Sequence, residues 1–263
     1  MFCIMLLRSI IKLLICVIDI CNLSKIKMQF TFLTQVIPSK PTACSTIRSL
    51  HGISLNGYYT LFDSSNRPYH AFCDFQSDPG YAWTLIESLS LTYAQSASFR
   101  RSFQDNVPSN ECTPNWSKYR LSITKMKSIQ NTASSTHFRA TCNFNGDSEK
   151  GLQNRRDYVR VSFCAYPYFL TARSTWTCAV VDYINIHGTS CSKCSIPFYS
   201  RATDHHLYID LSQAKVNCGR FNVSSAINGE DVFGSYGTVN NQFSCGRSSS
   251  STTNWWIGGT YCD

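Results

Sequence analysis

The chain has 263 residues, 43% hydrophobic, 13% aromatic and only 15% charged, a composition that excludes an intrinsically disordered protein and suits one large or two small domains. Its net charge of +8 falls to +4 after residue 43, where 19 basic residues stand against 15 acidic ones without any long run of Lys or Arg. Positive charge this sparse is not typical of a surface that binds a phosphate backbone, so we expect no nucleic-acid partner.

The N-terminal segment 1–23 is typical of a signal peptide. It is apolar and carries Arg8 and Lys12 in its first half. Its uninterrupted apolar run covers only 13–18 and Asp19 follows, whereas a membrane-spanning helix needs about 20 apolar residues. A signal peptide is therefore the first expectation, and a membrane anchor formed by this segment is the alternative.

Cysteine is the most informative residue type in the chain. Of 14 cysteines, eleven lie between Cys44 and Cys262. So many thiols favour an oxidising compartment and a disulfide framework. Eleven is an odd number, so five bridges leave one cysteine free or able to link a second chain. A zinc site needs grouped ligands, and the single close pair, Cys191 and Cys194, does not supply them.

These observations predict a secreted, extracellular protein, with anchoring by residues 1–21 as the alternative. Residues 24–43 are expected to form a leader or linker. Residues 44–263 are expected to form the folded domain, with 44–90 as its N-terminal subdomain.

Strand signals dominate the body of the chain. Runs of β-branched and aromatic residues, several of them bounded by turn residues, recur along it. The expected strands cover 58–62, 82–86, 158–163 and 176–186.

One helix is expected, beginning at Thr113 as N-cap with Pro114 in its first turn. Apolar residues then follow at spacings of three and four. They are Trp116, Tyr119, Ile123, Met126 and Ile129. Such a stripe predicts a face buried in the core.

Asn222 heads an Asn-Val-Ser sequon and is the expected glycosylation site of a secreted body.

Residues 44–88 contain five features in a fixed order. A cysteine at Cys44 is followed by a Gly-Tyr-Tyr strand at 57–59, an Arg-Pro-Tyr segment at 67–69, Cys-Asp-Phe at 73–75 and Gly-Tyr-Ala-Trp-Thr at 80–84. This order resembles the opening subdomain of fibrinogen-related domains.

The resemblance implies a disulfide between Cys44 and Cys73. It covers about 45 residues, and beyond residue 90 the aspartate-rich calcium loop of that family is not visible. We expect an α+β, disulfide-rich, fibrinogen-C-terminal-like domain. It would have a small N-terminal sheet, a mixed central sheet and a loop-rich C-terminal region.

Thr203-Asp204-His205-His206 and Ser235-Tyr236-Gly237-Thr238 are similar to stretches of the intelectin branch, whose members are calcium-dependent glycan-binding lectins. The similarity implies calcium ligation by Asp204 and His205. The chain departs from the branch at Ala202 and Arg220, where that branch supplies oxygen ligands, which leaves a calcium ion short of its six to eight oxygens.

Four side chains make up the densest metal-capable set in the sequence. They are Asp204, His205, His206 and Asp210. The hypothesis is that they hold calcium or a transition metal that presents a glycan diol. The alternative is a polar loop that enters a strand at 207–209, because adjacent histidines point to opposite sides of a strand.

Tyr236, Trp255 and Trp256 are candidates for an aromatic platform beneath a sugar ring, although core packing is the alternative for the tryptophans. Catalytic signatures such as GxSxG, HExxH, a Walker loop or GxGxxG do not occur, so we do not expect an enzyme. Cys191 and Cys194 share only the spacing of a redox pair.

The first functional prediction is a secreted lectin-like recognition protein whose shallow site lies in 203–236. Its partners would be glycans or glycoproteins, with calcium as the cofactor that the resemblance implies. Shallow sugar sites gain avidity from oligomers, and an unpaired cysteine offers a covalent route to one. The alternative is a structural or adhesive extracellular domain that binds proteins without metal. A disulfide oxidoreductase using Cys191 and Cys194 is a third hypothesis.

Overall fold

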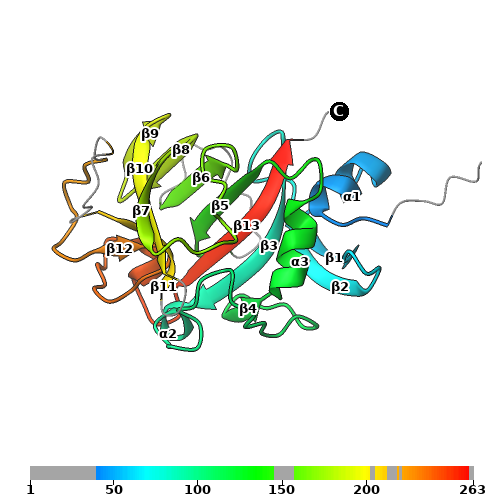
Figure 1. Cartoon of the computed structure of the whole chain (residues 1–263), viewed down its shortest axis with the longest axis horizontal. Helices are drawn as coiled ribbons and strands as arrows, with labels where there is room; N and C mark the ends of the chain where they lie inside the picture. Colours follow the sequence, from blue (N-terminus) through cyan, green and yellow to red (C-terminus); the bar gives the residue numbers. More distant parts are fainter. Residues whose placement is uncertain (1–39, 145–156, 202–204, 212–217, 219–220, 261–263) are drawn as a thin grey trace, which may run out of the picture. The chain divides into compact units, whose positions relative to one another are not determined.

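The structure, a computed structural model, describes residues 40–144, 157–201, 205–211, 218 and 221–260. In these residues the chain is mostly β, with a few short helices and two antiparallel sheets (Figure 1). This agrees with the α+β expectation at the level of class. None of the helices in these residues is long and apolar enough to cross a membrane. The expected signal peptide or anchor, and most of the expected linker, lie outside the described residues.

The first sheet has nine strands in the order β1-β2-β3-β13-β5-β6-β8-β9, with β4 paired to β3. Its strands, in chain order, are β1 (Gly57–Phe62), β2 (Pro68–Asp74), β3 (Tyr81–Ser90), β4 (Lys118–Arg120), β5 (His137–Cys142), β6 (Tyr158–Ser162), β8 (Tyr183–Ile186), β9 (Thr189–Ser192) and β13 (Thr252–Thr260).

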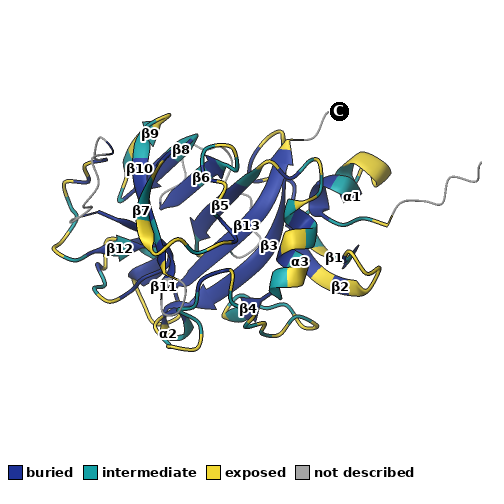
Figure 2. Ribbon diagram, in the orientation of Figure 1, coloured by how far each residue is buried: buried dark blue, intermediate teal, exposed yellow. Residues whose placement is uncertain are grey.

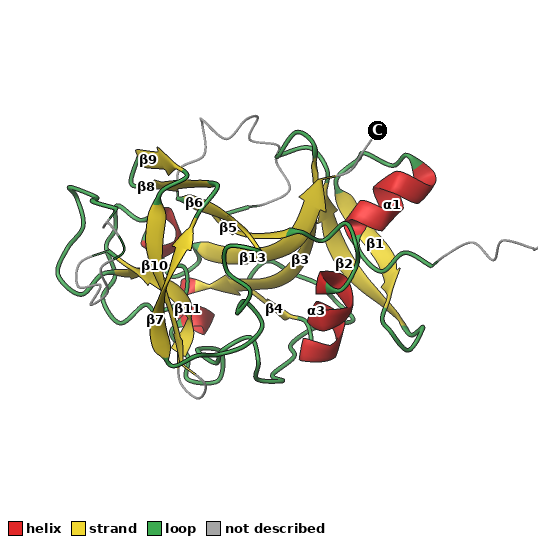
Figure 3. Cartoon of the chain, turned by 45° about the horizontal axis from the view of Figure 1, so that its top comes forward, coloured by secondary structure: helices red, strands yellow, loops and turns green. Residues whose placement is uncertain are grey.

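The second sheet has four strands in the order β12-β11-β10-β7. They are β7 (Thr175–Val180), β10 (Ser195–Arg201), β11 (His205–Asp210) and β12 (Asp231–Val232). The helical segments are α1 (Cys44–His51), α2 (Leu91–Ala94), α3 (Ile123–Gln130) and η2 (Ser244–Gly246). Helices α1 and α3 pack against β3 and β13 (Figure 3).

Strand β13, near the C-terminal end of the chain, lies in the middle of the first sheet between β3 and β5. All of its residues except Thr260 are buried, and β3 is buried along nearly its whole length (Figure 2). Two glycines make this close fit possible. A Cβ at Gly258 would lie 2.1 Å from the carbonyl oxygen of Ala82, and one at Gly259 would lie 1.9 Å from that of Ser134. A larger residue at Gly258 would therefore push β13 away from β3, and one at Gly259 would displace the turn before β5.

The expected small N-terminal sheet and mixed central sheet were wrong in detail. Strands β1 to β3 belong to the same sheet as β13, and every strand pair in the described residues is antiparallel. The reason is that β13 returns from the far end of the chain to pair with β3. A pairing across so long a sequence separation leaves no local signal.

The expected helix from Thr113 was also wrong over its first half. Asn115 accepts hydrogen bonds from the backbone N–H groups of Ser117 and Lys118, which forms a turn, and Tyr119 then pairs with Ser88 in the ladder of β3 and β4. Only α3 is helical. Pairing with β3 therefore overrides the apolar periodicity of the sequence.

The expected strand over 176–186 is two strands that belong to different sheets, β7 and β8. Between them, the backbone N–H of Val181 donates to Cys194 and that of Asp182 donates to Arg160. The β-branched run is continuous in sequence, so the change of sheet depends on these long-range bonds.

Four disulfides lie within the described residues, which are Cys44–Cys73, Cys142–Cys245, Cys178–Cys218 and Cys191–Cys194. The first is the pair that the resemblance implies. Within the described part of the chain, Cys112 and Cys164 are free and exposed. Disulfides of this number are typical of extracellular proteins.

Candidate functional site

Trp255 and Trp256 are core residues, which corrects their expected role in a sugar platform. Both are 0% exposed. The Nε1–H of Trp255 donates to the carbonyl of Phe233 at 3.1 Å, and that of Trp256 donates to the Thr141 hydroxyl at 3.0 Å. A ring without an exposed face cannot stack on a sugar, so neither indole forms a surface platform in this structure.

Tyr236 is likewise buried, and its hydroxyl hydrogen-bonds to the hydroxyl of Thr253 on β13. Burial raises the pKa of Tyr236, so the ring stays a neutral phenol. Its expected role as an exposed ligand-binding residue was therefore wrong, and the ring helps to close the core beside β13.

Of the expected metal set, only the side chains of His206 and Asp210 are among the described residues. Asp204 lies outside the described residues, as does the side chain of His205. His206 is buried, with Nε2 2.8 Å from Glu87 Oε1 and Nδ1 2.9 Å from the carbonyl of Arg101. Both of its nitrogens thus face acceptors and neither offers a lone pair to a cation. Among the residues that the structure describes, no group of three His, Cys, Asp or Glu side chains could hold a metal ion. The calcium ligation that the resemblance implies for Asp204 and His205 involves side chains outside the described residues, so it stays a prediction.

Asp210 is buried and lies opposite Asp231 in the pairing of β11 with β12. Burial raises the pKa of Asp231 to about 7, and the nearby charge of Asp210 contributes. A hydrogen bond from Ser235 acts in the opposite direction. The two carboxyl groups thus disfavour double ionisation.

His206 belongs to a buried ion-pair cluster with Glu87 of β3 and Arg120 of β4. Arg120 is 0% exposed and its Nη1 lies 2.9 Å from Glu87 Oε2, while its Nη2 donates to the carbonyl of Ser102 at 2.6 Å. Burial alone would raise the pKa of Glu87, but His206 and Arg120 lower it. The carboxylate is therefore ionised and compensated on both oxygens.

A cavity of about 10 Å³ borders this cluster and is lined by Glu87, His206, Tyr236 and neighbouring apolar side chains. That volume accommodates about one water molecule. A glycan or any other organic ligand is too large for it, so the cluster ties β3, β4 and β11 together rather than forming a ligand site.

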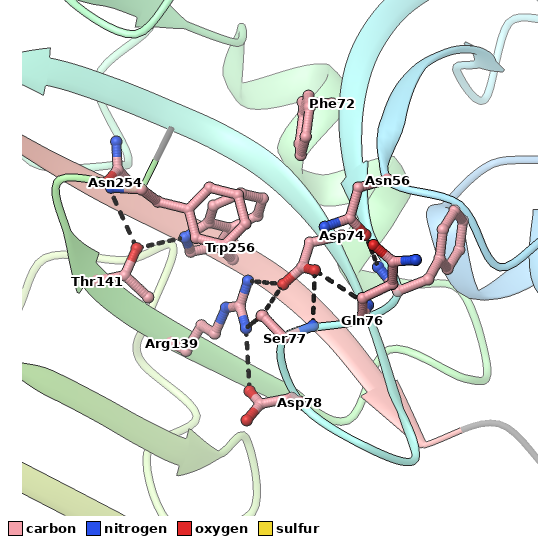
Figure 4. Close-up of polar contacts among 12 residues, drawn as sticks. Asn56, Phe72, Asp74, Gln76, Ser77, Asp78, Arg139, Thr141, Asn254 and Trp256 are labelled. Carbon is pink, nitrogen blue, oxygen red and sulfur yellow. Dashed lines mark hydrogen bonds and ion pairs between the residues drawn. The ribbon is translucent and has the colours of Figure 1, made fainter. Parts of the chain in front are cut away.

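A second buried network surrounds Arg139 on β5 (Figure 4). Its Nη2 lies 2.5 Å from Asp74 Oδ2, and its Nη1 lies 3.0 Å from Asp78 Oδ2, and all three side chains are fully buried. The guanidinium carbon is 4.7 Å from the ring centroid of Trp83 and 4.5 Å from that of Trp256.

Arg139 and Asp74 stabilise each other's charged forms. Burial alone would raise the pKa of Asp74, but Arg139 and the hydrogen bonds of Ser77 lower it. Burial alone would lower the pKa of Arg139, but Asp74 and Asp78 raise it. Tyr158 donates a further hydrogen bond to Asp78 at 2.6 Å. The network holds the segment after β2 against β5 and β6, so its role is structural.

The outer face of the four-stranded sheet carries a different arrangement, a row of three aromatic side chains. Trp176 on β7 is directly opposite Tyr199 on β10, and Tyr199 is opposite Tyr208 on β11. The ring centroids are 4.8 Å apart for Trp176 and Tyr199 and 5.3 Å apart for Tyr199 and Tyr208. We call these three residues the aromatic row.

The aromatic row differs from the core rings in exposure. Trp176 and Tyr199 are partly exposed, whereas Phe198, the neighbour of Tyr199 on the opposite face of β10, is 0% exposed. Figure 2 shows exposed residues along β7 as well. From the sequence, Trp176 was expected only as part of a strand and Tyr199 had no predicted role. Period-two alternation along β10 was the available signal, but Pro197 and Phe198 are both buried and mask it.

Asn222 is exposed in a segment without regular secondary structure, as an accessible sequon requires. Asn115, by contrast, uses its side chain in the turn before β4. The two Asn-x-Ser sequons in the described residues therefore differ in availability, and Asn222 remains the predicted glycosylation site.

Comparisons with known proteins found no family model that matches the chain and no match among curated proteins.

Proposed function

We propose that the chain is a secreted, lectin-like recognition protein that binds glycans through the aromatic row on β7, β10 and β11. The observation that carries this proposal is the partial exposure of Trp176 and Tyr199 side by side on the solvent face of a sheet whose other face is core. Indole and phenol faces offer apolar contact to the CH face of a sugar ring, and tyrosine hydroxyls offer hydrogen bonds to its hydroxyls.

Contact between a sugar ring and the aromatic row requires no metal ion. Weak contacts of this kind require several copies for useful avidity. The exposed free cysteines Cys112 and Cys164 offer a covalent route to such an oligomer.

We further propose that the fold is a fibrinogen-related domain, because the residues that carry the resemblance have defined structural roles. Cys44 is bonded to Cys73, and the backbone N–H of Cys44 donates to the Thr84 hydroxyl at 3.0 Å. Asp74 and Trp83 both contact Arg139. The pattern thus corresponds to a connected set of contacts around the start of the domain.

The proposal is tested by applying the secreted full-length protein to a glycan array with and without a chelator. We expect retention on a subset of glycans that the chelator does not abolish. Replacing Trp176 with alanine should reduce that retention at least tenfold. Tyr58→Ala is the matched control, because Tyr58 is 50% exposed on β1, in the other sheet.

Equal losses in the two variants would contradict a site at the aromatic row. An array without any bound glycan would instead favour the structural or adhesive alternative, in which the domain binds proteins.

A further inference from the structure

Cys191 and Cys194 close the smallest of the four disulfide loops. Their separation in sequence is 3 residues, against 29, 40 and 103 for the other pairs. The stabilisation that a disulfide confers by restricting the unfolded chain grows with loop length. The Cys191–Cys194 bond is therefore expected to stabilise the fold less than the other three disulfides do. A chemical role of the pair is worth testing.

The position of the pair makes it reachable from solvent. Cys191 lies on β9, which stands at one end of the nine-stranded order and pairs, within the described residues, with β8 alone. Cys191 and Cys194 are both partly exposed, whereas Cys44 and Cys73 are 0% exposed. An extended peptide can pair with the backbone of such an edge strand.

Ionic side chains lie next to the two cysteines. Lys193, between them in sequence, contacts Asp182, and the other oxygen of Asp182 lies 3.1 Å from His137 Nε2. The hydrogen bond from His137 lowers the pKa of Asp182 to about 2, so this carboxylate is ionised at neutral pH. The turn between the two cysteines therefore carries an ion pair.

Lys193 also has an uncommon backbone conformation. Its φ is +57°, in the left-handed region that non-glycine residues rarely adopt. The turn that brings Cys194 to Cys191 therefore costs conformational energy, and reduction of the bond would release this turn.

We propose that Cys191–Cys194 is a thiol–disulfide exchange site whose substrate is a protein dithiol presented in an extended segment. A substrate thiolate attacks one of the two sulfurs, the Cys191–Cys194 bond breaks, and the departing sulfur takes a proton from solvent. The second substrate thiol then attacks the mixed disulfide and releases the other cysteine. In total the substrate dithiol is oxidised to a disulfide, and Cys191 and Cys194 are reduced to two thiols. This site is independent of the aromatic row.

The test uses the full-length native protein in a series of reduced and oxidised glutathione ratios, followed by acid quenching, alkylation and peptide mass spectrometry. We expect Cys191 and Cys194 to be more than half reduced while Cys44–Cys73 and Cys142–Cys245 stay closed. Cys178–Cys218 is the internal control, because Cys178 is also exposed but closes a longer loop. Reduction of Cys191–Cys194 only together with these other pairs would overturn the proposal.

A second measurement uses Cys194→Ser, which leaves Cys191 as a single thiol, and a peptide that carries a disulfide. A mixed disulfide should form at Cys191 at least ten times faster than at the exposed free cysteine Cys164 in the same molecule. Equal rates at the two positions would contradict a specialised site, and circular dichroism of the variant verifies that it is folded.

A third measurement distinguishes a protein dithiol from glutathione as the source of the attacking thiol. It compares the rates at which a dithiol peptide and glutathione, at equal thiol concentration, reduce Cys191–Cys194 in the wild-type protein. A rate at least tenfold higher with the peptide supports a protein substrate. Equal rates overturn the protein dithiol as the specific substrate.

Discussion

The two sheets use aromatic side chains in opposite ways. In the nine-stranded sheet, Trp255 and Trp256 are fully buried, and ion pairs are buried beside them around Glu87 and Arg139. In the four-stranded sheet, Trp176 and Tyr199 of the aromatic row are partly exposed on the outer face, whereas Tyr208 is buried. The same chemical groups thus stabilise the fold in one sheet and remain available for binding in the other. Burial, rather than residue type, therefore distinguishes the two sets of aromatic side chains.

The largest expected loss of stability in the nine-stranded sheet comes from removing its long-range disulfide. Replacing Cys142 and Cys245 with serine should lower the free energy of unfolding by about 4 to 5 kcal/mol, because the bond closes a long loop, with a sequence separation of 103. The same replacement at Cys191 and Cys194 should cost about 2 kcal/mol or less. Urea denaturation of both double variants measures the difference, and equal losses would contradict the assignment of a mainly structural role to the first pair alone.

Removal of the buried guanidinium tests the ion-pair network. Arg139→Met should cost about 3 to 5 kcal/mol, because Asp74 and Asp78 would remain buried without their cation. Arg160→Met is the matched control. Arg160 is partly exposed and its Nη1 lies 3.9 Å from Asp78, so we expect about 1 kcal/mol or less. Chemical denaturation compares the two variants, and a similar loss in both would mean that the network is not held by Arg139.

A pair of tryptophan variants tests the comparison of the two sheets directly. Trp256→Ala should cost about 3 to 5 kcal/mol of stability, because the ring is 0% exposed and leaves a cavity. Trp176→Ala should cost about 1 kcal/mol and act mainly on glycan retention, because its ring is partly exposed. Thermal unfolding measures stability in both variants. If Trp176→Ala lowered the stability as much as Trp256→Ala, the aromatic row would contribute mainly to the fold.

The smallest expected effect is a pH dependence in the four-stranded sheet. The folded-state pKa of Asp231 is about 7, above its ordinary value of 3.8. Its contribution to stability is therefore fully present below about pH 4 and is lost as the pH rises to about 7. Asp231→Asn should flatten this decline, so the thermal midpoint of the variant should fall less than that of the wild type between pH 5 and pH 8. Parallel curves would indicate that Asp231 does not bind the proton.

The sequence by itself determined the local features of the chain. Alternating, β-branched and aromatic runs located β1, β3 and β6, because these signals lie in neighbouring residues of the sequence. The number of cysteines predicted disulfides, and the resemblance implied Cys44–Cys73. Such inferences succeed when the physical cause lies within a few residues or within a motif of fixed order.

Only the tertiary structure decided which polar and aromatic side chains are buried. His206 and Asp210 have the residue types of metal ligands, but Glu87 and Asp231, distant in sequence, are placed against them. Trp255 and Trp256 end in the core because β13 is inserted between β3 and β5, while Trp176 and Tyr199 meet only when β7 pairs with β10. Each of these outcomes depends on which strands pair across long separations, and an individual residue type carries no record of that choice.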